Sequence, residues 1–327
     1  MEVVQLKRLV VFLCCIPLFL LVACTDEEQA VESKRKEVDV PIETVEINEA
    51  NELKIVPLYT QYQQYLNASL ETEDMEENKR LFKKFVLDYI EEIGEDEKFS
   101  TADLKGNFLL TSTSYEQQLL KQIEILIQRH DEITEIIRTT YSDSSQVLPK
   151  KKSTVFLAPF NPEFSSVSES MAGVGGAAYK DVFVLYLDAD FDKEILAYST
   201  AHEYHHLILY DQPGFNISSV LKSVIVEGKA DAFADRIVKD VSPPWNVPMD
   251  DATARHIASL VNHYETTFSD FVVGNNQKEI PRWSNYMLGR DMLNHYLASH
   301  PHLSIPEWTF KEDHDILEGY KYEALLK

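Results

Sequence analysis

Cysteine is almost missing from this chain of 327 residues: its three copies, Cys14, Cys15 and Cys24, all lie at or before position 24. The rest of the sequence therefore has no disulfide framework, no thiol nucleophile and no cysteine zinc knuckle, so any metal there must be bound by histidine and carboxylate. Basic residues are also few, 31 against 54 acidic ones, and the net charge is −23. We expect no nucleic-acid partner, because phosphate binding needs a basic surface.

Residues 1–23 have the pattern of a secretory signal peptide. Lys7 and Arg8 precede the apolar run Leu9–Ala23, which contains Pro17 and is too short for a membrane-spanning helix. The end of this run, Leu21-Val22-Ala23-Cys24, resembles the bacterial lipobox, in which the cysteine is lipidated and becomes the first residue of the mature protein. We therefore expect lipidation of Cys24 and anchoring at the extracytoplasmic face of a bacterial cell membrane. The alternative is an ordinary signal peptide that happens to contain a cysteine.

The next two segments differ in pattern. Residues 24–51 are acidic and poor in aromatic residues, which predicts a disordered acidic tether. Between 52 and 148, apolar residues recur with the helical period, most clearly at 81–90 and 119–127. This region is therefore predicted to be a mainly helical accessory region whose apolar stripe packs into a core.

The pattern changes again after residue 149. The runs Thr154–Leu157 and Val182–Leu187 are β-branched and aromatic and predict two strands, with Gly173, Gly175 and Gly176 in their connection. The remaining sequence predicts four helices, at about 192–210, 217–239, 250–268 and 284–299. The predicted fold class is α+β, with a small sheet plus helices in 149–327 and a mainly helical N-terminal half.

The first of these four helices contains the H-E-x-x-H pattern at His202-Glu203-Tyr204-His205-His206. On a helix, His202 and His206 lie one turn apart on one face, so their two imidazoles can bind one Zn²⁺. Glu203 points about 100° away around the helix and can take a proton from the attacking water without being a ligand. The alternative is a set of histidines on a solvated helix face.

A catalytic zinc needs a third protein ligand, and the sequence offers one on the next helix. Glu227, in Val226-Glu227-Gly228-Lys229-Ala230-Asp231, supplies a carboxylate within an apolar stretch. Asp231 lies on the same face at i, i+4, where it can accept the second N–H of a ligand histidine and fix its tautomer. The alternatives are an exposed helix acid for Glu227 and a surface charge or salt bridge for Asp231.

His202-Glu203-Tyr204-His205-His206 followed by Glu227-Gly228-x-Ala230-Asp231 resembles the gluzincin metallopeptidases. More narrowly, the chain resembles a bacterial domain-of-unknown-function family of predicted zinc-dependent proteases, often secreted or lipid-anchored, over about 150–300. The resemblance implies a zincin-like catalytic domain at 149–327 with one Zn²⁺ per chain. It also implies His202, His206 and Glu227 as zinc ligands, Glu203 as general base and Asp231 as the partner of a ligand histidine.

Gluzincins usually also present a His or Tyr to the oxyanion, and no motif fixes that residue here. Tyr286, in Tyr286-x-x-Gly289, is a candidate because a phenol can donate to a developing oxyanion. A buried aromatic residue with a satisfied hydroxyl is its other interpretation. His205 is expected to be a hydrogen-bonded structural histidine, or else part of the substrate wall.

The function expected from these features is hydrolysis of peptide bonds at the cell surface by a zinc-dependent peptidase. Its partners would be a peptide or unfolded protein substrate and, through the N-terminal lipid, the membrane. The strand at 182–187 is expected to run beside the cleft and to pair with an extended peptide. The rival hypothesis is a non-catalytic surface lipoprotein, an adhesion or chaperone-like module with a structural or vestigial metal site. Glu203 argues against the rival, because a structural site has no need of a glutamate there.

Overall fold

The computed structural model describes residues 38–48 and 51–327. The expected signal peptide at 1–23, Cys24 and the first part of the expected tether lie outside the described residues. In the part of the chain that is described, no helix is both long enough and apolar enough to cross a membrane.

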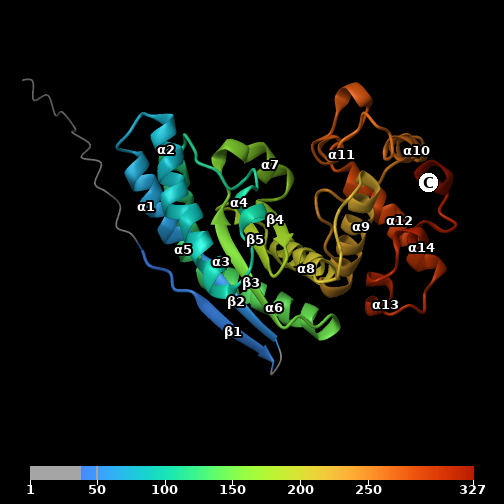
Figure 1. The fold of residues 1–327 in the computed structure, drawn as a ribbon, viewed down its shortest axis with the longest axis horizontal. Helices are drawn as coiled ribbons and strands as arrows, with labels where there is room; N and C mark the ends of the chain where they lie inside the picture. Colours follow the sequence, from blue (N-terminus) through green and yellow to red (C-terminus); the bar gives the residue numbers. More distant parts are fainter. Residues whose placement is uncertain (1–37, 49–50) are drawn as a thin grey trace, which may run out of the picture. The chain divides into compact units, whose positions relative to one another are not determined.

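One mixed sheet of five strands contains segments from both halves of the sequence (Figure 1). In spatial order its strands are β1 (Glu43–Asn48), β2 (Asn51–Pro57), β3 (Lys152–Pro159), β5 (Val182–Leu187) and β4 (Val174–Tyr179). The pairs β2–β3 and β3–β5 are parallel, whereas the outer pairs β1–β2 and β5–β4 are antiparallel. The expected α+β class, with a small sheet and many helices, is confirmed.

Two of these strands lie where other structure was expected. β1 falls within the expected tether at 24–51, and β2 covers the beginning of the region expected to be helical. In β1, half-buried Val45 and Ile47 alternate with exposed Thr44 and Glu46, which is the period of a strand with one covered face. β2 pairs with β1 on one edge and, on the other, with β3, almost 100 residues later in the chain, and its last residues Ile55, Val56 and Pro57 are buried.

The strand expected to bind an extended peptide is in the wrong place for that role. β5 lies between β3 and β4, so both of its edges are already paired. The open edge on this side of the sheet belongs to β4, which contains Gly175 and Gly176. The expected glycine-bearing connection is therefore partly a strand. On this side of the sheet, β4 is the strand whose free edge could pair with the main chain of a peptide.

Helices follow β2 as far as residue 147. They are α1 (Tyr59–Ser69), α2 (Met75–Phe82), a π-helical segment η1 (Lys83–Leu87), α3 (Asp88–Glu97), α4 (Ala102–Lys105), α5 (Glu116–Gln128) and α6 (His130–Val147). The predicted helical segments at 81–90 and 119–127 lie in the run from α2 to α3 and in α5. Their apolar stripes are buried in the core, as the period indicated.

The remaining helices are short except for three. They are η2 (Pro162–Phe164), α7 (Ser165–Ser170), α8 (Lys193–Tyr210), α9 (Val220–Ile237), α10 (Asp251–Leu260), α11 (Phe268–Val273), η3 (Asn276–Lys278), α12 (Ser284–Ser299), α13 (Ile305–Thr309), α14 (Asp313–Leu317) and α15 (Glu323–Leu326). The helices expected at 192–210, 217–239 and 284–299 are α8, α9 and α12. The helix expected at 250–268 ends at Leu260, and a separate short helix, α11, begins at Phe268.

α8 lies between the sheet and the C-terminal helices (Figure 1). It packs against β4 and α6 on one side and against α9 on the other, and α9 in turn packs along α12. Asp192 caps the start of α8 by accepting hydrogen bonds from the backbone N–H groups of Glu194 and Ile195, and Ser219 caps α9. Nearly all of α8 from Ile195 to Leu209 is buried, so its polar residues are enclosed, and these include both histidines of the H-E-x-x-H pattern.

Candidate metal centre

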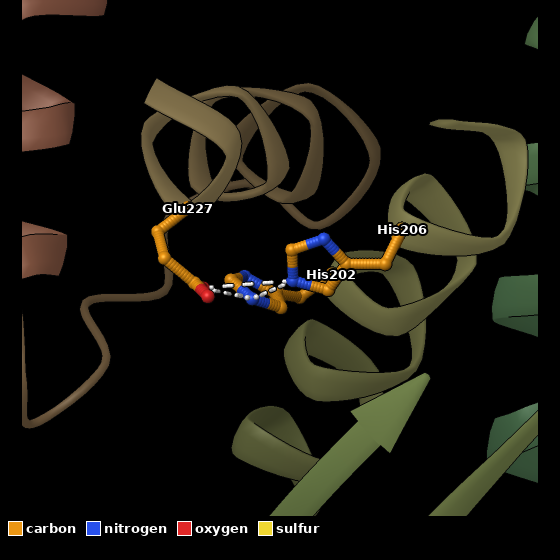
Figure 2. A group of neighbouring side chains, drawn as sticks. All are labelled: His202, His206 and Glu227. Carbon is orange, nitrogen blue, oxygen red and sulfur yellow. Dashed lines mark hydrogen bonds and ion pairs between the residues drawn. The ribbon is translucent and has the colours of Figure 1, made fainter. Parts of the chain in front are cut away.

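The side chains of His202, His206 and Glu227 converge on one point between α8 and α9 (Figure 2). The Nε2 atoms of His202 and His206 are 3.0 Å apart. Glu227 Oε2 lies 3.1 Å from His202 Nε2 and 3.5 Å from His206 Nε2. All three residues are buried, and within the described residues they are the one group of three histidines or carboxylates close enough to share an ion.

These three distances fit a zinc ion. In a triangle of this size, the point equidistant from the corners lies about 1.9 Å from each, which is close to zinc's ligand distances of about 2.0–2.2 Å. Two imidazoles and a carboxylate are also a ligand set that catalytic zinc uses, with a position left open. The His-His-Glu group therefore fits a zinc site.

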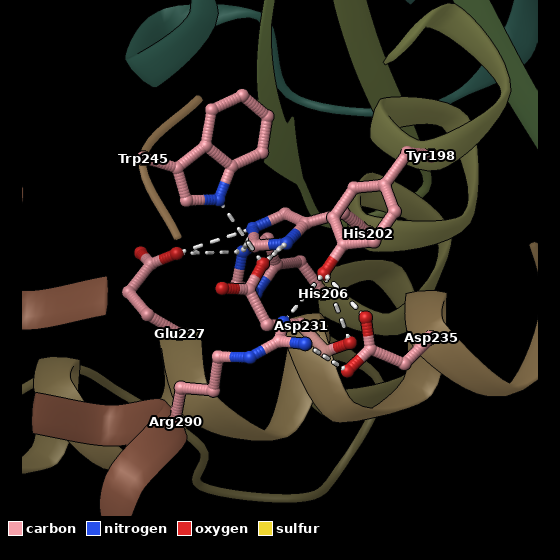
Figure 3. A network of polar contacts seen from close by, with 8 residues as sticks. All are labelled: Tyr198, His202, His206, Glu227, Asp231, Asp235, Trp245 and Arg290. Atoms are coloured by element: carbon pink, nitrogen blue, oxygen red, sulfur yellow. Dashed lines mark hydrogen bonds and ion pairs between the residues drawn. The ribbon is translucent and has the colours of Figure 1, made fainter. Parts of the chain in front are cut away.

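Asp231 contacts the ring nitrogen of His202 that does not face Glu227 (Figure 3). His202 Nδ1 donates to Asp231 Oδ1 over 2.9 Å, so the Nε2 lone pair of a neutral His202 faces the other two ligand atoms. The indole Nε1 of Trp245 donates to the same oxygen over 3.3 Å. Asp231 is completely buried, and these two donors hold its carboxylate in place.

A second polar group fixes the helices around Asp231 (Figure 3). The hydroxyl of Tyr198 donates to the main-chain oxygen of Asp231 and to Asp235, each over 3.2 Å. Arg290 on α12 pairs with Asp235 at 2.6 Å and donates to the Tyr198 hydroxyl at 3.2 Å. The network connects α8, α9 and α12, and its members Tyr198, Asp235 and Arg290 carried no signal in the sequence.

The charges of this group depend on one another. Burial acts to lower the pKa of His202, but hydrogen bonds with Asp231 and Glu227 outweigh it and raise that pKa well above its ordinary value. Burial acts to raise the pKa of Glu227, but the charge of His206 and the hydrogen bond with His202 hold it below its usual range. The site therefore favours a positive charge at its centre. A proton on the ligand group supplies this charge in the metal-free protein, and a bound cation can replace that proton.

Glu203 lies beside the metal-ligand group but is not part of it. It is buried between α8 and β4, where a Cβ on Gly176 would lie 2.4 Å from its Oε1 atom. Its carboxylate accepts a hydrogen bond from the backbone N–H of Ala178, while Oε2 has no hydrogen-bond partner within the described residues. Burial raises the pKa of Glu203, although the charges of His206 and His202 oppose that shift.

Tyr286 also reaches this site, from the first turn of α12. Its ring centroid is 5.9 Å from that of His202, and it lines the same cleft as Glu227. Burial, followed by the charges of Glu227 and Glu203, raises the pKa of Tyr286 well above its ordinary value, so the phenol stays protonated. His205, in contrast, lies in the core, where it stacks on Trp308 and its Nε2 is 3.3 Å from Thr309 Oγ1.

A cleft of about 640 Å³ opens over Glu203, His206, Glu227 and Tyr286. Tyr210 lines it too, and burial, followed by the charge of Glu227, raises the pKa of Tyr210 to about 12. Tyr210 was not among the residues expected at the site. Its position one helical turn after His206 is the sequence signal that could have identified it.

Comparison with known proteins agrees with this geometry. A family model described as predicted Zn-dependent protease (DUF2268) matches residues 133–318, which is more than half of the chain. The match begins within α6, ends just after α14 and contains every residue of the metal centre. No curated protein matches the chain.

Proposed function

Since the chain belongs to this family of predicted Zn-dependent proteases, we propose that it is a metallopeptidase of the gluzincin type. His202, His206 and Glu227 would hold one zinc ion, and Asp231 would orient His202. The ion, when bound, supplies Lewis acidity: it lowers the pKa of water and polarises a carbonyl group. One observation carries the proposal: a buried glutamate, with one carboxylate oxygen that has no hydrogen-bond partner among the described residues, lines the same cleft as two of the three ligands, His206 and Glu227.

Glu203 is the group that moves protons in this proposal. A water oxygen attacks the carbonyl carbon of the scissile bond, and Glu203 takes the proton that the water loses. When the C–N bond breaks, the same carboxyl passes this proton to the departing nitrogen, so Glu203 ends each cycle ionised. Burial raises the pKa of Glu203, which brings its proton affinity closer to that of the groups it serves.

Tyr286 is proposed to donate a hydrogen bond to the carbonyl oxygen as negative charge develops on it. Tyr286 lines the same cleft as Glu203 and Glu227, which places its phenol beside the proposed substrate. Because its pKa is raised, the phenol keeps the proton that this role needs.

The edge of β4 is proposed to hold the substrate main chain. Alternate residues of an edge strand turn their N–H and C=O groups to the open side, so Gly176 presents its main chain on the side where Ala178 meets Glu203. A peptide added as a further strand would be extended beside the general base. The substrates expected are therefore extended peptides and segments of unfolded proteins.

The test of the activity compares Glu203→Gln with the wild type, using an unfolded protein and mixed peptides as substrates. Zinc content should stay at one per chain while turnover falls at least about 10²–10⁴-fold, since general acid–base groups contribute that much. Glu194→Gln, an exposed glutamate in the first turn of the same helix, is the matched control and should keep wild-type turnover. Bound zinc with no hydrolysis by the wild type would support the non-catalytic alternative instead.

The location is a separate proposal. We propose that lipidation of Cys24 anchors the protein at the extracytoplasmic face of a bacterial membrane. Cys24→Ala should then leave the precursor unprocessed or release the protein from the membrane fraction, with activity in solution unchanged. A mature-sized Cys24→Ala protein that still sediments with membranes would contradict lipid anchoring.

A further inference from the structure

The cleft over Glu203 is lined mainly by apolar side chains. Its acidic and basic lining groups are Glu203, His206 and Glu227, all of which belong to the metal centre. Among the described residues that line it, none is lysine, arginine or aspartate. A charged substrate side chain next to the scissile bond would therefore lose its hydration without gaining a partner of opposite charge outside the metal centre.

One wall of the cleft comes from segments next to the open edge of the sheet. Phe108, in the loop after α4, and Met171, at the end of α7, both line it. Phe108 is 62% exposed, and its ring stands edge-on to that of Phe164 at a centroid distance of 5.5 Å. An exposed aromatic ring is thus held beside the strand that the substrate main chain would join.

The opposite wall comes from the C-terminal helices and the loop before α9. Ile217 in that loop and Phe268 at the start of α11 are 40% and 47% exposed. Trp283 completes the wall, with its ring centroid 5.6 Å from that of Tyr286. Phe268 is fixed by a capping box between Thr267 and Asp270, so its exposure is built into the first turn of its helix.

Large exposed apolar residues lie on both walls of one cleft, and this arrangement favours the binding of an apolar group. Phe108, Ile217 and Phe268 belong to three separate segments of the chain, yet all three border the cleft that contains the metal ligands. Water contacts with such side chains are unfavourable, and clustered exposed apolar residues are typical of binding sites. A peptide held along β4 is the occupant that this position admits.

We infer that the cleft selects extended peptide segments with large apolar side chains, such as Phe, Leu or Met, next to the scissile bond. Acidic side chains at these positions are rejected, since the ionisable groups already there include two carboxylates and the chain carries a net charge of −23. The inference rests on the proposed peptidase function. It adds the substrate class and names Phe108 and Phe268 as residues that determine specificity.

Binding to a catalytically inactive protein tests this selection apart from turnover. Full-length, zinc-loaded Glu203→Gln is titrated into fluorescent ten-residue peptides that differ at one central position, which is Phe, Leu, Lys, Glu or Gly. Fluorescence anisotropy should give dissociation constants about tenfold or more lower for Phe and Leu than for Glu and Gly. The Lys peptide should also bind more weakly than the Phe peptide.

Second-site variants then locate the selection. In the Glu203→Gln background, Phe268→Ala and Phe108→Ala should each raise the dissociation constant of the Phe peptide about tenfold and leave that of the Gly peptide nearly unchanged. Tyr264→Ala is the matched control, because Tyr264 is 87% exposed in the segment before α11 and does not line the cleft. Thermal melts show whether each variant is folded, and the two phenylalanines lie on opposite walls, so one unfolded variant leaves the other informative.

Equal affinity for all five peptides, no binding of any of them, or unchanged binding in folded Phe108→Ala and Phe268→Ala proteins would overturn the inference. Selective binding of the Phe peptide together with no cleavage of it by the wild type has a different meaning. That outcome would reject the proposed peptidase function and leave apolar selection in place as a property of a binding cleft.

Discussion

The main chains of Gly228 and Gly289 touch where α9 packs along α12. A Cβ on Gly228 would lie 2.3 Å from the carbonyl oxygen of Gly289, and a Cβ on Gly289 would lie 2.1 Å from the carbonyl oxygen of Val224. This contact sets the distance between the helices next to Glu227 and one turn from Tyr286. The placement of Glu227 and Tyr286 along one cleft therefore depends on two residues that have no side chain.

Gly289→Ala should consequently damage both the fold and the metal centre. A methyl group there cannot fit without separating α9 from α12, and overpacking of this kind costs about 1–3 kcal/mol of the free energy of unfolding. The zinc affinity should fall as well, because Glu227 moves with α9. Denaturant titration and competition with a zinc chelator measure the two effects.

Gly106→Ala is the matched control for that substitution. Gly106 has an ordinary φ of −84°, and no atom would lie nearer than 3.4 Å to an added Cβ. The free energy of unfolding of the Gly106→Ala protein should stay within about 0.5 kcal/mol of the wild-type value. If the Gly289→Ala protein had the same free energy of unfolding and the same zinc affinity as the Gly106→Ala protein, the close contact between α9 and α12 would not be what positions Glu227.

A different glycine controls the general base. In Gly176→Ala the new methyl group would lie 2.4 Å from Glu203 Oε1 and 2.8 Å from its Cγ, so the buried carboxylate has to move. Zinc binding should survive, since Gly176 touches none of the three ligands, while turnover should fall toward that of Glu203→Gln. Steady-state kinetics and zinc analysis on the same preparations separate the two properties.

The double variant Gly176→Ala/Glu203→Gln provides the control. If the methyl group acts only by displacing Glu203, the double variant should be no slower than Glu203→Gln, because both changes remove one function. Additive losses would instead show that Gly176 acts elsewhere, for example on the edge of β4.

The expected helices follow from the sequence because their signals are local. Apolar periodicity places α8, α9 and α12 within a few residues of their observed bounds. The H-E-x-x-H spacing brings His202 and His206 to one helix face by helix geometry alone. Predicting that Glu227 joins them required only one further assumption, that the next helix packs against the first.

The parts that the sequence did not predict depend on distant contacts. β2 is a strand because it pairs with β3. The glycines of β4 suggest a turn in the sequence, and only the structure shows that Gly176 leaves room for the Glu203 side chain. Trp245 meets Asp231 only after the chain has turned past α9, and Arg290 meets Asp235 only because α9 and α12 pack closely. No local sequence pattern predicts these contacts.

The ligands and their supports should differ in a graded way. His202→Ala, His206→Ala and Glu227→Ala should each lose bound zinc, whereas Asp231→Asn should weaken zinc binding by about 10–100-fold, as is typical of groups that orient a ligand histidine. Trp245→Phe removes one donor to Asp231 and should have a smaller effect than Asp231→Asn.

Zinc content after dialysis and chelator competition rank these five variants, with Glu203→Gln as the reference that keeps its zinc. Retention of a full zinc equivalent by Glu227→Ala would remove Glu227 from the ligand set. An Asp231→Asn protein with wild-type affinity would show that the bond to His202 Nδ1 does not tune the metal.

The pH dependence of activity should reflect the buried base. Burial raises the pKa of Glu203 above its ordinary value of 4.5, and only the ionised carboxylate accepts a proton. The acidic limb of kcat/KM should therefore lie at a higher pH than for an exposed glutamate, and activity should be lost as the pH falls through it. A pH–rate profile that stays flat down to the ordinary pKa of glutamate would contradict this assignment.

Lys229 should give the stability of the protein a distinctive dependence on pH. Lys229 is 3% exposed, and its ammonium donates to the carbonyl oxygens of Thr309 and Lys311 over 3.0 and 2.6 Å. Burial, followed by the charge of Lys222, lowers its pKa from 10.5 to about 8. Between these values the unfolded chain holds the proton and the native protein does not, so the free energy of unfolding should rise with pH, by up to about 3 kcal/mol.

Lys229→Met should remove that rise, because methionine fills the same space without a titrating group. Denaturant titrations from pH 7.5 to about 10.5, with a chelator present to remove the pH dependence of zinc binding, should show the wild type gaining stability relative to the variant. Lys239→Met, which changes an exposed lysine just after α9, is the control and should keep the wild-type slope. Parallel curves for wild type and Lys229→Met would mean that the buried ammonium keeps its proton throughout, held by the two carbonyl groups.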